Sequence, residues 1–333
     1  MSGQAKDFWM PHEQESLMTP ADHETQADLE HTSLPQFIED IDRRSNTTQH
    51  DFGNDGSITL TQMRGDNEAS SKRALVLFYP YGNGSTPAMK LRGRVYQAYL
   101  GDDRQVVSVP NNMFMKPTYT LSENVPPTHA VAQNTVRALQ EVGIEEVDVV
   151  GESLGAMFGS FALLAAYDHL DVKSASLKDA PNTVDRSDKQ LKKDFQGKGT
   201  ENLQKLNQVI HMTGLPALVD AQHAHGGFRA IPQMLGLARF QLGAMYGPNA
   251  QLRPSMAERT FVDTLVASPV ATQLGSHLQI VRYESSAICT PEIETDLASH
   301  GLLENLVTVK YLGHEGTDHV VMNALLNRTA IAS

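Results

Sequence analysis

The sequence predicts an α/β fold in which a mostly parallel sheet is flanked by helices. From residue 74 onward, short apolar runs typical of buried strands alternate with segments of helical spacing. A Gly-x-Ser-x-Gly pentapeptide lies where one of these strands meets the following helix. A long stretch without a convincing strand, residues 185–273, interrupts the alternation.

Residues 1–54 are expected to form an acidic, flexible N-terminal tail. Acidic residues outnumber basic ones there, and aliphatic residues are few. Little apolar burial is therefore available to offset the entropic cost of ordering this segment. Within it, residues 33–42 are compatible with one or two turns of helix.

Residues 55–184 are expected to form the first part of the core. Continuous apolar runs predict strands buried on both faces, and apolar residues at helical spacing predict helices between them. The predicted strands are 56–63, 74–80, 105–110, 145–151 and 172–181, and the predicted helices are 87–100, 128–143 and 154–167. This rhythm favours parallel strands that are joined by crossover helices.

Residues 185–273 are expected to form a helical cap or lid inserted into the sheet. Such insertions usually cover the carboxyl ends of the strands, where open sheets bind ligands. Helices are predicted over 200–213, 228–246 and 255–267. The alternation resumes over 274–333, the second part of the core, with strands at 278–284 and 306–312 and helices at 291–300 and 319–331.

Composition excludes several classes of function. The 333 residues include 27 basic and 39 acidic residues, a net charge of −12, which argues against nucleic-acid binding through a general positive field. One cysteine excludes a disulfide framework and a multi-cysteine metal site. The mean hydropathy is −0.32, and neither a membrane span nor a secretory signal is recognisable. We expect a cytoplasmic protein without a nucleic-acid or membrane partner.

The strongest functional signal is Gly-Glu-Ser-Leu-Gly at 151–155. A buried strand leads directly into it and an apolar helix leaves it, which is the context of a nucleophile elbow. The serine, Ser153, lies on a tight turn where side chains two residues to either side would clash, so both flanks are glycine. The turn leaves backbone amides at the helix start available to an oxyanion.

These features resemble the α/β-hydrolase superfamily. The resemblance rests on the elbow, on the order of elements around it and on the late Gly/His segment, and it covers roughly residues 55–331. It implies that Ser153 is the nucleophile and that the Leu154 amide is one oxyanion donor. The second donor would be the amide of Gly82 or Asn83, in a loop where Tyr81 replaces the histidine of the usual His-Gly pair.

A serine nucleophile requires a base, which in this family follows the last strand. His314 and His319 both qualify. We favour His319, because it opens the last helix and its Gly-x-x-His-x-x-Met-Asn surroundings resemble the histidine loop of the family. His314 is the alternative base. Their five-residue spacing excludes a helix-borne zinc pair, so we expect no metal.

The third member of the triad departs from the family pattern. The usual acid follows the penultimate strand, but serine and alanine stand there, in Glu284-Ser285-Ser286-Ala287. Glu284 is adjacent to that position. The other known location, after the strand that follows the elbow helix, provides Asp179. Both candidates remain open, as does a chain without a triad acid.

The sequence therefore predicts a serine hydrolase that cleaves a carboxylic ester or thioester through an acyl-enzyme intermediate. Its partner would be a small-molecule acyl substrate, and no cofactor is needed. One alternative is a non-catalytic protein of the same fold that binds a ligand or partner. Another is an acyltransferase or peptidase that uses the same serine. The substrate's identity and the oligomeric state have no signature in the sequence.

Overall fold

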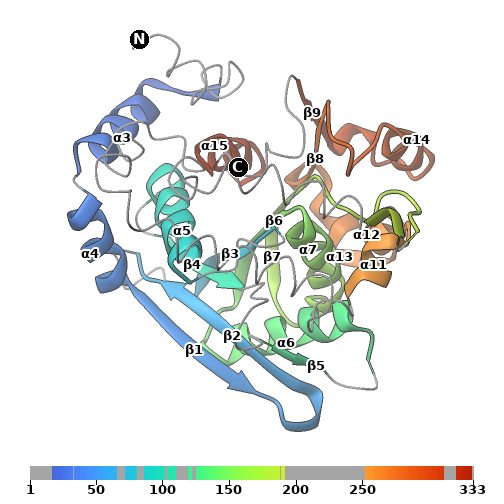
Figure 1. Ribbon diagram of the computed structural model, residues 1–333, viewed down its shortest axis with the longest axis horizontal. Helices are drawn as coiled ribbons and strands as arrows, with labels where there is room; N and C mark the ends of the chain where they lie inside the picture. Colours follow the sequence, from blue (N-terminus) through green and yellow to red (C-terminus); the bar gives the residue numbers. More distant parts are fainter. Residues whose placement is uncertain are drawn as a thin grey trace.

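One sheet runs through the middle of the protein, as a computed structural model shows (Figure 1). The structure describes residues 17–32, 34–65, 72–80, 86–101, 104–109, 119–121, 125–187, 189–191, 252–310 and 320–331. The strand order is β1-β2-β4-β3-β6-β7-β8-β9, and β5 pairs with β2. The strands are β1 (Ser45–Asp51), β2 (Gly56–Met63), β3 (Arg73–Phe78), β4 (Gln105–Val109), β5 (Tyr119–Leu121), β6 (Glu146–Glu152), β7 (Asp171–Lys178), β8 (Leu278–Tyr283) and β9 (Leu306–Val309).

The central strands are parallel and buried on both faces. β4, β3, β6, β7, β8 and β9 pair in parallel, whereas β2 pairs antiparallel with its neighbours β1, β4 and β5. Side chains alternate between the two faces: in β3, Val76 and Phe78 enter one apolar core, and Leu75 and Leu77 enter the other. The two-sided burial predicted from continuous apolar runs is confirmed for β3 and β6.

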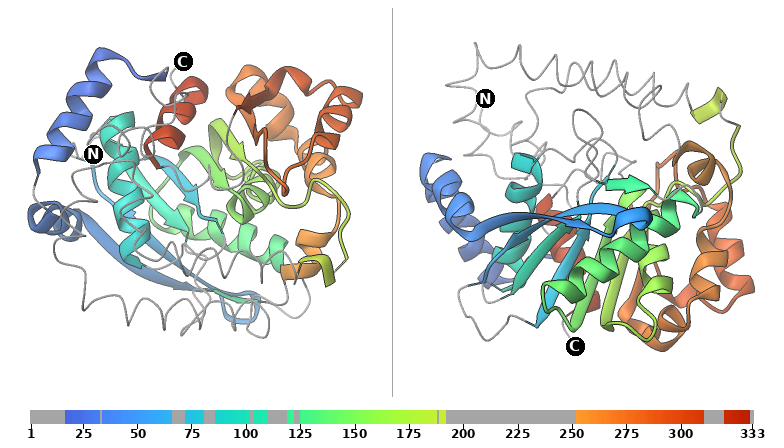
Figure 2. Two further views of the ribbon diagram at one scale, coloured as in Figure 1. Left: turned by 45° about the horizontal axis from the view of Figure 1, so that its top comes forward. Right: turned by 90° about the horizontal axis from the view of Figure 1, so that it is seen from below.

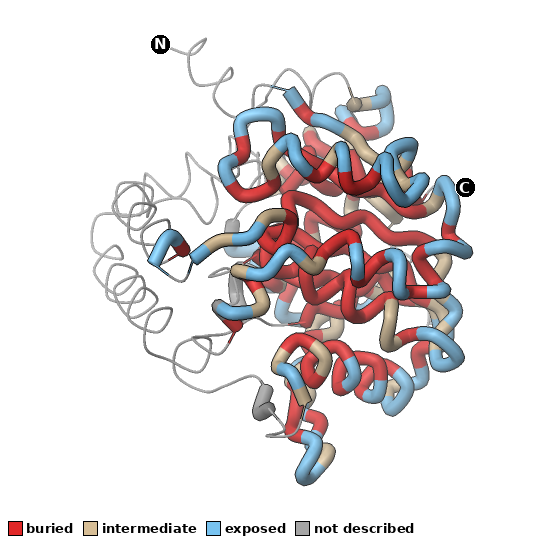
Figure 3. Tube along the Cα trace, turned by 90° about the vertical axis from the view of Figure 1, so that its right-hand side faces the viewer, coloured by how far each residue is buried: buried red, intermediate tan, exposed pale blue. Residues whose placement is uncertain are grey.

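Helices cover both faces of the sheet (Figure 2). On one face, α6 (Pro127–Glu141) and α7 (Leu154–Ala165) pack in a core that contains Val131 and Met157. On the other, α5 (Thr86–Leu100) and α15 (Val320–Ile331) pack in a core that contains Tyr96 and Leu325. Figure 3 shows the buried interior and the exposed outer turns that surround it.

The N-terminal segment differs from the flexible tail expected over 1–54. Its described residues form α3 (Pro20–His31), α4 (Leu34–Arg44) and β1. β1 pairs with β2 over its whole length, from the Ser45–Met63 pair to the Asp51–Ser57 pair. The buried apolar side chains of this segment, Leu29, Phe37 and Ile41, join the core of α5.

Ion pairs explain how so acidic a segment is ordered. Asp40 in α4 accepts hydrogen bonds from Arg43, Arg44 and Arg94, the last of which lies on α5. Burial alone would raise the pKa of the Asp40 carboxyl, but these arginines lower it to about 2. Asp22 in α3 is likewise paired with Arg328 of α15. The composition shows the charges of this segment, but two of the cationic partners, Arg94 and Arg328, come from helices distant in sequence.

Residues 252–274 belong to the core and not to the cap expected over 185–273. They form α11 (Arg253–Ala257), α12 (Phe261–Ala267) and α13 (Pro269–Leu274), most of whose apolar residues are buried in the core of α7. α13 leads into β8, so this segment is the crossover that parallel β7 and β8 require. The helix expected over 255–267 is therefore divided between α11 and α12. The helices expected over 200–213 and 228–246 lie outside the described residues.

Candidate active site

The direction of the strand order reverses at β3 and β6, where the carboxyl ends of the parallel strands meet. From β3 the chain moves outward to β4, and it then returns to β6 on the other side of β3. Open α/β sheets bind ligands beyond the carboxyl ends of the strands at such a reversal. Ser153 is the residue that directly follows β6. The topology thus brings Ser153 to the place where a ligand site is expected.

Ser153 occupies a strained turn between β6 and α7. Its φ is 54° and its ψ is −121°, a conformation that few residues other than glycine adopt. The Ser153 carbonyl accepts the Ala156 amide at 2.8 Å, which starts the helix. Leu154 is the first residue of α7, and amides in a first helical turn have no carbonyl partner within their own helix. The Leu154 amide therefore lies where an oxyanion donor is expected.

The two glycines of the motif are required by close backbone contacts. A Cβ atom on Gly151 would lie 2.4 Å from the Gly155 carbonyl oxygen. A Cβ atom on Gly155 would lie 2.0 Å from the carbonyl oxygen of Phe78, the last residue of β3. The backbone of the elbow thus contacts both its own first helical turn and the end of β3. These contacts leave no room for a side chain at either position.

The backbone of Ser153 is also tied to β7. Its amide donates to the Lys178 carbonyl at 2.7 Å, and Asp179 is the next residue of the chain. Asp179 has a φ of 52°, and its amide donates to the Val281 carbonyl of β8 at 2.8 Å. The Asp179 side chain is fully buried, and its carboxylate accepts a hydrogen bond from the Ser286 hydroxyl at 2.8 Å.

Glu284, the other candidate acid, has a different environment. It directly follows β8, and its amide donates to the Val309 carbonyl of β9 at 2.8 Å. Unlike Asp179, Glu284 is exposed to solvent. The two carboxylates therefore lie at neighbouring strand ends, but only Asp179 is held inside the protein.

Three solved structures resemble the chain over most of its length. One is MGS-M2, an α/β hydrolase from a Medee basin deep-sea metagenome library, with a TM-score of 0.55 and 15% identity over 86% of this chain and 98% of that one. Another is the serine hydrolase CCSP0084 from Cycloclasticus zankles, with a TM-score of 0.54 and 16% identity over 85% and 97%. The third is naproxen esterase from Bacillus subtilis, with a TM-score of 0.51 and 16% identity over 91% and 99%. No protein-family model and no curated protein matches the sequence.

The chain has the α/β-hydrolase fold. The predicted fold class, a mostly parallel sheet flanked by helices, is confirmed by the strand pairing and by these three structures. At such low identity the likeness concerns the fold, and the chemistry has to be argued from the side chains.

Several predicted site residues lie outside the described part of this α/β-hydrolase fold. They are the two candidate bases and the two candidate donors of the second oxyanion amide: His314, His319, Gly82 and Asn83. The described residues that flank them are Pro80 after β3, Lys310 after β9 and Val320 at the start of α15. The segment with both histidines therefore connects the carboxyl end of β9 to α15.

Sequence reasoning missed a buried cluster of charged residues beneath the elbow. The Glu152 carboxylate, next to Ser153, is paired with Arg92 of α5 at 2.5 Å and also accepts the Tyr96 hydroxyl. Lys178 donates to Asn327 of α15. Burial lowers the pKa of Lys178 to about 8, although the Glu152 carboxylate opposes that shift. No local pattern indicates these contacts, because each one joins elements that are far apart in sequence.

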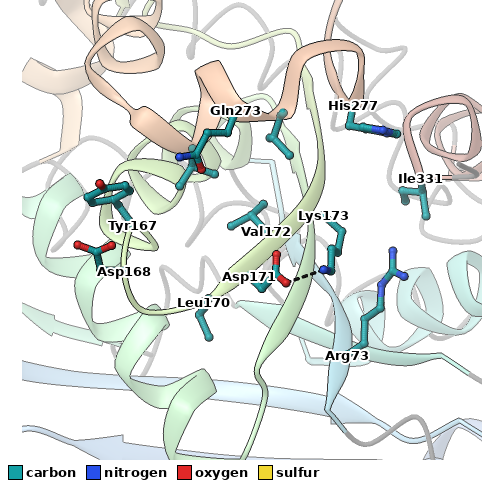
Figure 4. Close-up of a pocket in the computed structure, with 12 residues that line it drawn as sticks. Arg73, Tyr167, Asp168, Leu170, Asp171, Val172, Lys173, Gln273, His277 and Ile331 are labelled. Atoms are coloured by element: carbon teal, nitrogen blue, oxygen red, sulfur yellow. Dashed lines mark hydrogen bonds and ion pairs between the residues drawn. The ribbon is translucent and has the colours of Figure 1, made fainter.

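A pocket of about 580 Å³ lies at the amino ends of the parallel strands, opposite to the carboxyl ends where Ser153 lies (Figure 4). Its lining includes Arg73 and Asp171, the first residues of β3 and β7, and His277, which directly precedes β8. Ser153, in contrast, follows the last residue of a parallel strand. The Lys173 ammonium in this pocket is already paired with the Asp171 carboxylate. The pocket is therefore separate from the candidate active site.

Two further kinds of site have no counterpart among the described residues. Within the described ranges, no group of three or more His, Cys, Asp or Glu side chains is arranged to hold a metal ion. In the same part of the chain, no helix is long and apolar enough to cross a membrane. Cys289 is buried, and burial together with the nearby Asp179 carboxylate raises the pKa of its thiol, so it is not poised to act as a nucleophile.

Proposed function

We propose that the protein is a serine hydrolase that cleaves a carboxylic ester or thioester through an acyl-enzyme intermediate. The observation that carries this proposal is the strained backbone of Ser153 at the junction of β6 and α7. Such a conformation costs about 1–3 kcal/mol and persists only where the surrounding structure imposes it. Here it is imposed by the close backbone contacts at Gly151 and Gly155 and by the hydrogen bond from the Ser153 amide to the Lys178 carbonyl. Strain at a nucleophile elbow has the function of presenting the hydroxyl to a substrate.

In the proposed mechanism, the Ser153 hydroxyl attacks the acyl carbonyl while a histidine accepts its proton. We assign this base to His319, with His314 as the alternative. The base then returns the proton to the leaving alcohol or thiol, and a water molecule releases the acyl group by the reverse sequence. The Leu154 amide and the amide of Gly82 or Asn83 would stabilise the oxyanion.

We assign the triad acid to Asp179 in preference to Glu284. A triad acid holds the imidazole in one tautomer and orientation, which a buried carboxylate with a fixed position does best. Asp179 is fully buried and directly follows Lys178, the residue bonded to the Ser153 amide. Glu284 is exposed to solvent, where water screens its charge.

The proposed substrate class rests on the similar structures as well as on Ser153. Two of the similar structures are named as an esterase and a serine hydrolase, and both names agree with acyl transfer to water. A small-molecule acyl ester or thioester is therefore the substrate that we propose. No cofactor takes part in the proposed steps.

The test is covalent labelling with a fluorophosphonate probe, followed by mass spectrometry of the labelled peptide. We expect the label on Ser153, and we expect Ser153→Ala to lose both the label and the hydrolysis of p-nitrophenyl butyrate, by about 10⁶-fold in kcat. Ser160→Ala is the matched control, because Ser160 lies on the same helix with its hydroxyl bonded to the Met157 carbonyl. An unlabelled wild-type protein would favour the non-catalytic alternative.

A further inference from the structure

Ser286 is the third residue after β8, in the region where an α/β hydrolase is expected to carry its acid. Its amide donates to the Tyr283 carbonyl at 2.9 Å, which closes a tight turn after the strand. The side chain is buried and meets Asp179 from the end of neighbouring β7. The two residues are 107 positions apart in sequence. Where one carboxylate was expected, the fold therefore brings together a carboxylate and a hydroxyl.

The hydrogen bonds around Ser286 determine the direction of its hydroxyl proton. The Ser286 oxygen accepts the Ile288 amide at 3.0 Å and the Cys289 amide at 3.3 Å. A hydroxyl has one proton and two lone pairs, and both lone pairs are engaged by these amides. The proton is thus directed at the Oδ2 atom of Asp179, 2.8 Å away.

The backbone of Asp179 is held as firmly as its carboxylate. The left-handed φ of 52° and the hydrogen bond from the Asp179 amide to the Val281 carbonyl determine the position of the Asp179 Cα atom. With the Cα atom and Oδ2 both held, rotation of the carboxylate about its side-chain bonds is restricted. The second oxygen, Oδ1, then has one preferred direction in the site. A group that must orient an imidazole needs this kind of support from its neighbours.

We propose that Ser286 is a positioning residue that fixes the orientation of the Asp179 carboxylate, the proposed triad acid. This inference rests on the proposed function, since it requires Asp179 to act as the triad acid. In this protein the end of β7 supplies the acid, and the end of β8 supplies the hydroxyl that aims it.

The first experiment compares kcat and KM for p-nitrophenyl butyrate in single variants. Ser286→Ala should lower kcat about 10- to 100-fold, the size typical of groups that orient an active-site ligand, with KM nearly unchanged. Ser286→Thr keeps the hydroxyl and should remain within about threefold of wild type in kcat. The matched control is Ser285→Ala, because Ser285 is the adjacent serine but is exposed. Thermal unfolding followed by circular dichroism verifies that each variant is folded.

The second experiment is a double-mutant cycle with Asp179→Asn. Asparagine is isosteric with aspartate and tolerates the left-handed backbone, so the site should keep its shape. We expect Asp179→Asn alone to lower kcat about 10⁴-fold. If Ser286 acts through Asp179, adding Ser286→Ala to Asp179→Asn should lower kcat by less than about threefold. A purely structural role of Ser286 would multiply the two losses. If Ser286→Ala does not fold, Ser286→Cys takes its place, because a thiol is a weak donor of similar shape.

The outcomes separate this inference from the proposed function. Multiplying losses in the cycle, or a kcat of folded Ser286→Ala close to wild type, would overturn the role of Ser286 and leave Asp179 as the acid. A near-normal kcat of Asp179→Asn, in a protein that Ser153→Ala inactivates, would also overturn the inference while the serine hydrolase stands. A wild-type protein that neither hydrolyses the ester nor reacts with the fluorophosphonate would overturn the proposed function and the inference together.

Discussion

At the scale of single residues, the elbow depends on backbone contacts that a side chain would destroy. A Cβ atom on Gly155 would lie 2.0 Å and 2.8 Å from the carbonyl oxygens of Phe78 and Tyr79. These are backbone atoms, so the clash cannot be relieved by rotation of a flexible side chain. Backbone atoms of a central strand cannot move without disturbing the pairing of β3 with β4 and β6. Gly93 in α5 provides the contrast, since the nearest neighbour of a Cβ atom there would lie 3.5 Å away.

We therefore predict that Gly155→Ala loses fluorophosphonate labelling and is strongly destabilised. The matched control, Gly93→Ala, should be neutral or more stable by up to about 1 kcal/mol, because alanine favours a helix interior. Thermal unfolding and labelling of both variants provide the measurement. A Gly155→Ala protein that melts and labels like wild type would contradict the close approach of elbow and strand.

At the scale of elements, the N-terminal helix α4 illustrates how few side chains decide whether a segment is ordered. Phe37 and Ile41 are one helical turn apart and enter the core together with α5. Phe37 is 2% exposed, whereas the adjacent Ile38 is 49% exposed. Asp40 and Asp42 of α4 form ion pairs with Arg94 and Lys90 of α5.

From this packing we predict that Phe37→Ala lowers the free energy of unfolding by about 3–5 kcal/mol. Ile38→Ala removes a neighbouring apolar side chain from the surface and should change it by no more than about 0.5 kcal/mol. Urea titrations followed by circular dichroism compare the two variants. Equal, small effects would indicate that this segment is a tail after all.

At the scale of the whole molecule, the buried charges connect the helix layer formed by α5 and α15 to the sheet. Arg92 and Tyr96 of α5 meet Glu152 of β6, and Lys178 of β7 meets Asn327 of α15. Lys178 is fully buried, and its pKa of about 8 lies below the 10.5 of an unperturbed lysine. Below pH 8 the folded protein must therefore hold a charged ammonium group away from water, which opposes folding.

The sign of the pH dependence follows from this shift. Between about pH 8 and 10.5 the unfolded chain binds more protons at Lys178 than the folded one, so the contribution of Lys178 to stability rises with pH. The rise should amount to about 3 kcal/mol. We predict that the stability of wild type relative to Lys178→Met increases by this amount between pH 7 and 10.5. In the control, Lys310→Met removes an exposed lysine and should follow wild type across the same range.

The sequence alone determined the features that local pattern controls. The strands at 74–80 and 145–151 were predicted to within one or two residues, because a continuous apolar run is the direct signature of burial on both faces. The elbow was equally readable, since Gly151, Ser153 and Gly155 lie within five residues of one another and a Cβ atom on Gly151 would clash with the backbone of Gly155. The fold class follows from the order of such elements.

Only the tertiary structure decided the features that depend on contacts between distant segments. In the sequence, Asp179 and Glu284 are both acidic residues that follow a predicted strand. They differ in the structure because Asp179 is buried in the sheet and bonded to Ser286, whereas Glu284 is exposed. The ordering of α4 likewise depends on Arg94 and on apolar residues of α5. Residues 252–274 join the core because they pack against α7. Burial and hydrogen bonding are properties of neighbours in space, so a one-dimensional pattern does not carry them.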